Sequence, residues 1–423
     1  MSVRVDKLPN GITVATDTMP DVRTASLGIW VAAGARYEDE NEHGISHLLE
    51  HMAFKGTKKR TALQINEQIE NVGGELNAAT GIEVTSYYSR LLGNDMPLAF
   101  DILSDILTNS SFEQQELARE QSVIVQEIGG AADDPGDLVF DIFQETAFPG
   151  QAIGRPILGT PDTVRSFTPE KIRTYMAKRY CGEKMIVAAA GAVNHEELLA
   201  AAGAALASIP SGDVPQTKKA SYAGGSAIRA RKLEQTHLVL GLEGISYHSP
   251  ERFAIQAFVN LVGGGGSSRL YQEVRERRGL CYSIQAFHSS YQDAGLFGVT
   301  AGADASDTEE LTRVVIAELH QAAEKATQAE VDRAKAQMKV GLLSALESAS
   351  ARADQLGARL LAFGRAIPFE EIERNIDEIT LEGVRAAGRK LVSGGRPTFV
   401  GVGDAKGLER AGAASEALQR KAA

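Results

Sequence analysis

The chain is poor in cysteine. Its 423 residues contain only Cys181 and Cys281, one in each half and without a C-x-x-C pair. This argues against a disulfide framework and is typical of a compartment that keeps thiols reduced. With 43% hydrophobic and 23% charged residues, the remaining composition is ordinary for a globular protein.

Two further absences argue against whole classes of protein. No stretch approaches the roughly 20 consecutive apolar residues that a membrane-spanning helix needs. The chain also has no excess of positive charge, because 44 Lys and Arg stand against 55 Asp and Glu and give a net charge of -11. This charge argues against a nucleic-acid partner and mildly favours cationic peptide substrates.

The first residues lack the charged and then apolar pattern of a secretory signal, and they pass directly into a strand and turn near Leu8 to Gly11. We therefore expect a soluble cytoplasmic protein of the bacterial type. A mature organelle protein that has lost its presequence would show the same features, so the sequence leaves that location open.

An internal repeat accounts for the length of the chain. A chain of 423 residues exceeds one hydrophobic core of usual size and suits two domains of about 200 residues. Phe167–Ile172 leads through a helix to Met185–Gly191, and Ile379–Val384 leads likewise to Thr398–Gly403, at an offset of 212 positions. Duplication of one α/β domain explains this offset, so we predict an α+β protein with two similar halves.

The expected domain boundaries follow from a segment rich in helix and strand breakers. Residues 211–225 are polar and contain several prolines and glycines, so they are predicted to form a linker. This gives an N-terminal domain over 1–210 and a C-terminal domain over 226–423. The tail from about Leu408 is expected to be a loosely held helix or partly disordered. Strand-like and helix-like stretches alternate in both halves, for example at 25–31, 61–72, 237–242 and 330–345.

The most informative pattern is His47-x-x-Glu50-His51. Positions four apart lie on one face of a helix, so His47 and His51 can offer two imidazoles to one metal ion. Glu50 leans toward the same site, where a carboxylate can act as general base on a metal-bound water. The order is the inverse of H-E-x-x-H and is a signature of zinc peptidases.

The neighbours of this motif argue against the other reading, a solvated surface helix. Leu48, Leu49, Met52 and Phe54 give the segment an apolar flank, so the helix is predicted to pack against the core. Two imidazoles and a carboxylate inside a packed protein are costly without partners, and a metal ion removes that cost.

A zinc ion needs a third protein ligand. A helix is predicted to open near Ser110, whose spacing from Glu113 is that of a capping box, and to end at Gly129–Gly130. Glu120 and Glu127 lie seven positions apart on one face of this helix. The spacing alone does not separate a ligand from an ordinary acidic surface, so the third ligand stays open at this point.

Taken together, His47, Glu50, His51 and Glu127 resemble the inverted-motif zinc peptidases, the family of pitrilysin, insulysin and mitochondrial processing peptidase, and they are most similar to its processing-peptidase branch. The resemblance covers nearly the whole chain. It implies one Zn²⁺ per chain, held by His47, His51 and Glu127, with Glu50 as the base. Glu120 matches a second acidic residue that supports the site. The implied fold is a clam-like pair of halves, each a mostly antiparallel sheet with helices packed on it.

The resemblance also assigns contacts to the substrate near the metal. Residues 73–80, followed by 85–88, look like the family's edge strand beside the zinc, with Asn77 and Ala78 as substrate-binding residues. Such a strand pairs with an extended peptide through main-chain hydrogen bonds, a mode that tolerates many sequences. Phe54 matches the aromatic residue that lines the pocket for the residue after the cut.

Two further pairs complete the implied substrate contacts. Asp137 and Asp141, one turn apart on a predicted helix, match an acidic pair that holds an arginine upstream of the cut; a solvated helix face is the other reading. Arg275 and Tyr282 match a pair that reaches the substrate backbone and the developing oxyanion. The run Gly263–Gly266 has no Gly-Lys-Ser/Thr ending, so a phosphate loop is not expected.

The second half has no metal motif of its own, because Val259, Val262 and Gly263 occupy the positions equivalent to the motif. We therefore expect a zinc endopeptidase that cuts extended or presequence-like peptides, working as a homodimer. One alternative is a non-catalytic core or scaffold subunit, against which the intact ligand set argues. The other is an active subunit that needs a glycine-loop partner, against which the Arg and Tyr pair in the same chain argues.

Overall fold

The computed structural model describes residues 2–212, 217–416 and 418. The chain divides into two compact units, the first comprising Met1–Gly129, Pro156–Lys218 and Leu342–Pro368, and the second Gly130–Arg155, Lys219–Gly341 and Phe369–Ala423. In the part of the chain that is described, no helix combines the length and the apolar character that a membrane crossing requires.

The predicted domain boundaries need one correction. The change from the first to the second unit near Lys218 falls inside the predicted linker 211–225, of which residues 213–216 lie outside the described residues. Each unit, however, also contains a segment from the other half of the chain, namely 130–155 and 342–368. An amphipathic helix reveals in its sequence that it has an apolar face, but not which sheet covers that face.

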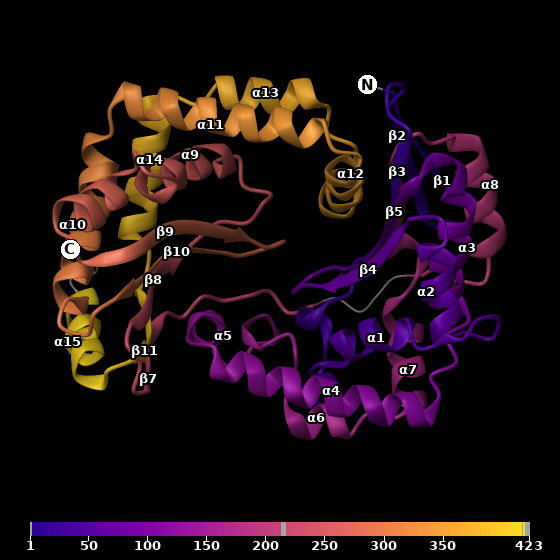
Figure 1. The fold of residues 1–423 in the computed structure, drawn as a ribbon. Coiled ribbons are helices and arrows are strands. Elements are labelled where there is room, and N and C mark those ends of the chain that lie inside the picture. Colours follow the sequence, from indigo (N-terminus) through magenta and orange to yellow (C-terminus); the bar gives the residue numbers. More distant parts are fainter. Residues whose placement is uncertain (1, 213–216, 417, 419–423) are drawn as a thin grey trace. The chain divides into compact units, whose positions relative to one another are not determined.

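A six-stranded sheet in the order β1-β2-β6-β3-β5-β4 forms the frame of the first unit (Figure 1). Its strands are β1 (Ser2–Lys7), β2 (Thr13–Thr18), β3 (Thr24–Val31), β4 (Glu75–Thr80), β5 (Thr85–Leu92) and β6 (Met185–Gly191). β2 and β6 are parallel, and the other neighbours are antiparallel. β6 is buried along its whole length because both faces of this central strand are covered, whereas β5 alternates between buried and less buried residues.

Helices and β3 and β5 enclose the main core of the first unit, which includes Leu27, Ile29, Leu48 and Ile102. These helices are α1 (Ile45–Ala53), α2 (Ala62–Glu70), α3 (Met96–Thr108), α4 (Gln114–Asp133), α6 (Pro161–Arg165), α7 (Pro169–Arg179) and α8 (His195–Ala205). α4 begins in the first unit and ends in the second. Because α1 and β4 both belong to this unit, the motif helix and the predicted edge strand lie in one compact body.

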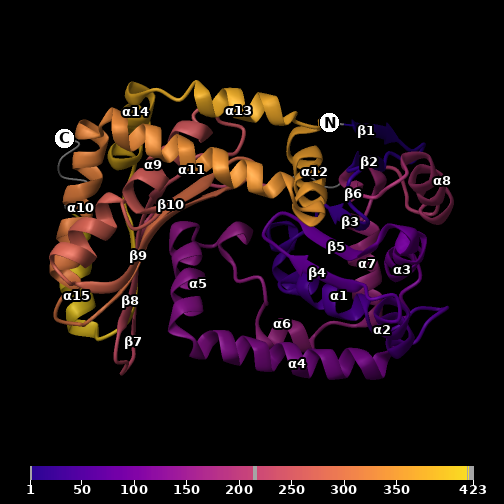
Figure 2. The same cartoon turned by 45° about the horizontal axis from the view of Figure 1, so that its top comes forward.

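A helix from the second half of the sequence, α12 (Ala349–Phe363), covers β2, β3 and β6 of the first sheet (Figure 2). Its Leu356 packs in a small apolar cluster with Trp30, and the Trp30 indole N–H donates to Asp354 at 3.2 Å. Gly357 allows this contact, since a Cβ atom there would come within 2.4 Å of the Trp30 ring. Large apolar surface on both partners explains why this segment joins the first unit.

α4, the helix that carries the two candidate glutamates, differs from its prediction at both ends. It starts at Gln114 and not near Ser110, because Phe112 adopts a left-handed backbone conformation with φ of 49°. It also continues through Gly129 and Gly130. Glycine weakens a helix but does not stop it when the following residues, here two alanines, favour the helix.

The second unit repeats the plan of the first with a five-stranded sheet in the order β7-β11-β8-β10-β9. Its strands are β7 (Gly225–Ala230), β8 (Thr236–Glu243), β9 (Cys281–Ser290), β10 (Gly295–Ala303) and β11 (Thr398–Gly403). β11 is parallel to β7 and antiparallel to β8, just as β6 is parallel to β2 and antiparallel to β3. The predicted duplication is thus confirmed, with β1 as an additional strand of the first sheet.

Seven helices of the second unit are described here: α5 (Pro135–Ala147), α9 (Arg252–Gly263), α10 (Thr308–Lys325), α11 (Gln328–Leu346, which ends in the first unit), α13 (Phe369–Asp377), α14 (Leu381–Ser393) and α15 (Ala405–Ser415). α5, which comes from the first half of the sequence, packs on β8 and β11 and sets Phe143 against Gly241. α15 is not loosely held as predicted, because Leu408 is fully buried and packs against Gly401. Residues 417 and 419–423 of the predicted tail lie outside the described residues.

His288 makes the second unit sensitive to acid. Its Nε2 accepts a hydrogen bond from the backbone N–H of Ile245 at 3.1 Å, and burial lowers the pKa of His288 to about 4 from its ordinary value of 6.5. Between these values the unfolded chain takes up a proton that the folded protein excludes. Stability is therefore greatest above pH 6.5 and falls toward pH 4, by up to about 3 kcal/mol.

Replacing His288 by glutamine removes this titration, so we expect a smaller loss of stability on acidification. The measurement is the free energy of unfolding in urea at pH 7 and at pH 4.5, for the wild type and for His288→Gln. The difference between the two pH values should shrink by about 2 kcal/mol in the variant. An equal difference in both proteins would show that His288 is not the acid-sensitive group.

Candidate metal centre

The carboxylate of Glu38 caps the N-terminus of α1, the helix of the motif. It accepts hydrogen bonds from the backbone N–H groups of Gly44 and Ser46, each at 2.8 Å, and places a negative charge where the helix dipole favours one. Of the apolar flank predicted from the sequence, Leu48, Leu49 and Met52 are buried and Phe54 is half-buried. This packing fixes the opposite face of α1, on which His47 and His51 lie.

His47, His51 and Glu127 come together in the first unit. The two imidazole centroids are 4.6 Å apart, at an angle of 65° between the ring planes. The Oε2 atom of Glu127, on α4, lies 3.9 Å from Nε2 of His47 and 3.6 Å from Nε2 of His51. In the described part of the chain, these three residues can each offer a ligand atom within 4.8 Å of the others.

This geometry fits a tetrahedral zinc ion. Ligand atoms about 2.1 Å from such an ion lie about 3.4 Å from one another. The observed separations of 3.6 and 3.9 Å are a few tenths of an ångström longer, which small side-chain rotations can close. Two imidazole nitrogens and one carboxylate oxygen are also the donor set of catalytic zinc sites that keep a fourth position for water.

The His47 imidazole is in the protonation state that a metal requires. Burial, and secondly the neighbouring His51, lowers the pKa of His47 to about 4, so its ring is neutral at pH 7. A neutral imidazole offers a lone pair to a metal ion, whereas an imidazolium does not. The Nδ1 atom of His47 is buried and has no hydrogen-bond partner among the described residues, so no second group holds this ring.

The His51 ring, in contrast, is held by a hydrogen bond at Nδ1, the nitrogen that points away from Glu127. Its Nδ1 lies 3.0 Å from Oε2 of Glu120, and Oε1 of Glu120 accepts from Nζ of Lys55 at 2.7 Å. A carboxylate at Nδ1 keeps the proton there, so that Nε2 is free to bind a metal. Lys55 was missed in the sequence, because it lies two residues beyond the end of α1, where helical spacing no longer predicts which side chains meet.

Glu50 is half-buried on α1, one position before His51. Tyr87 and Tyr180 lie close to it, and their hydroxyl oxygens are 3.0 Å apart. Burial raises the pKa of both hydroxyls, and the negative charge of Glu50 adds to this rise, so both tyrosines are protonated at neutral pH. Glu50 therefore stands beside two neutral hydroxyl groups and close in sequence to the two imidazoles.

β4 lies at the edge of the first sheet, as the family resemblance implies, and among the described strands it pairs with β5 alone. The hydroxyl of Thr80, its last residue, donates to the backbone carbonyl of Ser46 at 3.5 Å, which places this end of the strand at the start of α1. Asn77 is exposed, and its Oδ1 accepts from the N–H of Ala78 at 2.8 Å. Phe54 is half-buried directly after α1, where it packs against the core.

The remaining predicted residues belong to the second unit. Asp137 and Asp141 lie one turn apart on α5, as expected, and burial followed by the charge of Asp137 raises the pKa of Asp141. Arg275 lies on a short π-helix, Tyr271–Arg277, with its Cζ 4.6 Å from the Tyr271 ring centroid and 5.2 Å from that of Tyr282. Tyr282 is 77% exposed, so the pair is accessible to a ligand.

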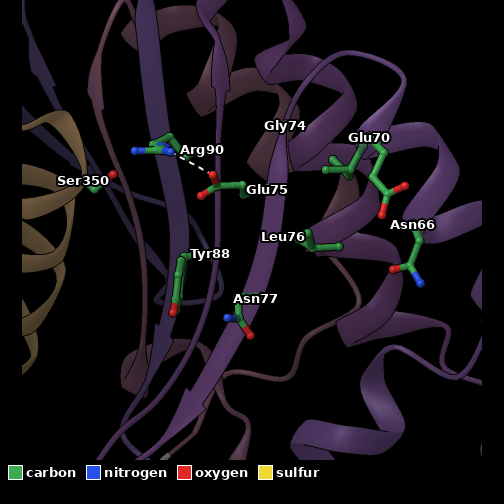
Figure 3. A pocket seen from close by; sticks show the side chains of 10 residues that line it. Asn66, Glu70, Gly74, Glu75, Leu76, Asn77, Tyr88, Arg90 and Ser350 are labelled. Atoms are coloured by element: carbon green, nitrogen blue, oxygen red, sulfur yellow. Dashed lines mark hydrogen bonds and ion pairs between the residues drawn. The ribbon is translucent and has the colours of Figure 1, made fainter.

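A groove with a volume of about 610 Å³ follows the free edge of β4 (Figure 3). It is lined by β4 itself, by Asn66 and Glu70 of α2, and by Tyr88 and Arg90 of β5. No function of α2 was predicted from the sequence. A signal was present in the sequence, since Glu70 is an acidic residue at the end of a predicted helix, where a basic residue is usual.

Comparisons with known proteins identify the family of the chain. The family Insulinase (Peptidase family M16) matches residues 13–161, which contain the complete ligand set, and Peptidase M16 inactive domain matches residues 166–338. The chain is 39% identical to an uncharacterized zinc protease of Streptomyces coelicolor, over 96% of this chain and 90% of the relative. It is 38% identical to an uncharacterized zinc protease of Rickettsia felis, over 92% and 95% of the two chains.

Mitochondrial-processing peptidase subunit beta of Homo sapiens is 34% identical, over 96% of this chain and 85% of the relative. Among solved structures, a peptidase M16 inactive domain from Pseudomonas fluorescens has a TM-score of 0.89 at 21% identity and covers 96% of this chain and 98% of its own. Complex III2 from Candida albicans contains a chain with a TM-score of 0.87 at 23% identity, which covers 98% and 100%.

At these identities the two solved structures show the fold alone, a mixed α/β fold with two similar halves. The names of the sequence relatives support a zinc peptidase, as the motif predicts. The chain belongs to peptidase family M16 and is close to its processing-peptidase branch.

Proposed function

We propose that the protein is a zinc endopeptidase in which His47, His51 and Glu127 hold one Zn²⁺ ion and Glu50 is the general base. The convergence of the three ligand atoms within 4.8 Å supports this assignment most directly. When bound, zinc supplies a Lewis acid that lowers the pKa of a coordinated water and polarises a carbonyl group.

The other chemical steps fall to residues of the chain. Glu50 accepts a proton from the attacking water and later gives it to the leaving amine. Glu120 orients the His51 ring and is itself held by Lys55. From the second unit, Arg275 and Tyr282 donate hydrogen bonds to the substrate backbone and to the oxyanion that develops during attack.

An extended peptide is the substrate that the edge of β4 supports. On its outer side, the strand around Asn77 and Ala78 pairs with no other described strand, and the Ala78 N–H is held by the Asn77 side chain. Such an edge binds another backbone without regard to its sequence. Phe54 receives the side chain after the cut, and Asp137 and Asp141 hold an arginine before it.

The role of Asp141 can be tested with two peptides that differ only in that arginine. We expect the wild type to cleave the arginine peptide more efficiently, by about tenfold, since a buried or half-buried ion pair contributes on the order of 1.4 kcal/mol. Asp141→Asn should lose most of this preference. An unchanged ratio of kcat/KM would show that the arginine binds elsewhere.

A second candidate is a catalytic subunit that needs a different partner chain. The human relative is named as a subunit, which favours this candidate over the predicted homodimer, whereas the two bacterial relatives are named as proteases without a subunit. We propose that the chain is active without a different partner because it carries both the ligand set and the Arg275 and Tyr282 pair. A cytoplasmic location stays a prediction, with which the two free cysteines agree.

One preparation distinguishes an enzyme that is active without a different partner, a subunit that needs such a partner, and a non-catalytic scaffold protein. The purified chain is analysed for zinc content, for molecular mass by gel filtration with light scattering, and for cleavage of an extended peptide. Zinc near one equivalent together with cleavage supports the proposal, and the mass gives the oligomeric state. Zinc without cleavage points to a missing partner, and absence of zinc points to a scaffold protein.

A further inference from the structure

The groove along β4 opens on both faces of the edge strand (Figure 3). Leu76 points toward α2, with Asn66 and Glu70, whereas Glu75 points toward Arg90 of β5. Side chains alternate along a strand, so a peptide added to this edge also sends successive side chains to the two walls. The groove therefore offers two chemically different surfaces to one bound peptide.

The two walls differ in charge. Glu75 and Arg90 neutralise each other through an ion pair at 2.8 Å. On the α2 wall, the side chains of Glu70 and Asn66 make no hydrogen bond or ion pair with any residue that the structure describes. This wall thus carries one uncompensated negative charge, next to the apolar surface of the half-buried Leu76.

The position of Glu70 in α2 does not serve the stability of the helix. Glu70 is the last residue of α2, and the last turn contains no basic residue. The C-terminus of a helix carries a partial negative charge and is stabilised by cations, so a carboxylate here is unfavourable. The turn that follows is fixed, because Gly73 has φ of 68° and the N–H of Gly74 donates to the carbonyl of Ile69 at 2.9 Å.

We propose that Glu70 and Asn66 form a subsite for a lysine or arginine side chain of the peptide, on the carboxyl side of the cut bond. The inference rests on the peptidase function proposed above. The aliphatic stem of the basic residue lies along Leu76, and its cationic end meets the Glu70 carboxylate and the carbonyl groups at the end of α2.

The position of this residue relative to the cut follows from the strand. Thr80 contacts Ser46, the residue before His47 at the start of α1, and Leu76 precedes Thr80 by four residues, or about 13 Å. Antiparallel pairing, which is the commoner arrangement, directs the carboxyl side of the peptide toward Leu76. The basic residue then stands about two to four positions after the cut bond.

The test uses peptides in which a single arginine or glutamine is moved through the five positions after the cut. The wild type should cleave the arginine peptide about 5-fold faster at one of these positions. Glu70→Gln should lose this preference. Glu67→Gln is the matched control, because Glu67 is exposed on the same helix but does not line the groove, and it should keep the preference.

Reversing the charge of Glu70 distinguishes a loss of peptide recognition from a damaged fold. Glu70→Lys should favour glutamate over arginine at the same position, an effect that a damaged fold cannot produce. Glu70→Gln should also raise the melting temperature slightly, since it removes the charge at the helix end. An arginine preference that is equal in the wild type and in Glu70→Gln, or one confined to positions before the cut, would overturn the inference.

Binding without hydrolysis separates this inference from the proposed function. Fluorescence anisotropy of the same peptides is measured with Glu50→Gln and with Glu50→Gln combined with Glu70→Gln. Loss of the arginine preference in the double variant supports the subsite, and retention contradicts it, whether or not the wild type cleaves any peptide. Failure of the wild type to cleave contradicts only the peptidase function.

Discussion

Glu50→Gln should lower the rate of peptide hydrolysis by about 1000-fold or more while leaving the zinc content unchanged. A general base contributes on the order of 10² to 10⁴ to such a reaction, and glutamine keeps the size of glutamate but cannot accept the proton. Glu50 does not belong to the cluster of ligand atoms formed by His47, His51 and Glu127, so its replacement leaves the metal ligands in place. The measurement is kcat for a fluorogenic peptide, together with zinc per chain by mass spectrometry.

Glu67→Gln is a suitable control for this experiment, since it makes the same chemical change on the exposed face of a neighbouring helix. It should retain full activity. Glu50→Gln should also retain the melting temperature of the wild type in the presence of zinc. A Glu50→Gln protein that holds zinc and cleaves peptides at the wild-type rate would exclude Glu50 as the base.

The second large effect concerns the two glutamates of α4. Glu127→Gln should weaken zinc binding by more than about 100-fold, because it removes a charged ligand from a three-residue site. Glu120→Gln should weaken it only about 10- to 100-fold, which is the usual effect of a residue that orients a histidine ligand. Glu120 lies 3.0 Å from Nδ1 of His51, on the side of the ring away from Glu127.

The affinities are obtained by competition with a chromogenic chelator, a measurement that does not depend on catalysis. The absorption spectrum of the Co²⁺ form provides a second readout, because a change of ligand alters the spectrum whereas a change behind a ligand does so only weakly. If the two variants bound zinc equally well, the assignment of Glu127 as ligand and Glu120 as support would be wrong.

Only part of the proposed ligand set could be predicted from the spacing of residues in the sequence. His47 and His51 could be paired from the sequence because both lie on one short helix, whose periodicity fixes their common face. Glu127 lies on another helix, and its spacing from Glu120 fits either residue as a ligand. In the sequence, only the resemblance to known zinc peptidases indicated which of the two glutamates is the ligand. In the structure, Glu127 lies near the Nε2 atoms of His47 and His51, whereas Glu120 lies near Nδ1 of His51.

Other features were absent from the predictions because they depend on contacts between distant segments. α5 and α12 each pack on the sheet formed by the other half of the sequence. The polar linker at 211–225 suggested a single boundary between the halves and gave no sign of this exchange. The C-terminal end of α4 was misplaced because Gly129 and Gly130, which usually end helices, lie inside it. The groove beside Glu70 exists because the chain turns sharply at Gly73, after the end of α2, so that β4 runs alongside this helix.

The sequence by itself determined the duplication and the two imidazoles of α1, because the first follows from repetition along the chain and the second from the periodicity of one helix, while the edge strand β4 followed from the family resemblance. Only the tertiary structure decided which glutamate faces the imidazoles, that Lys55 holds Glu120, and that Glu70 lies beside the strand edge without an ion-pair partner among the described residues. These are distances between residues on different elements, and they are fixed by the packing of whole helices against a sheet, which no local pattern encodes.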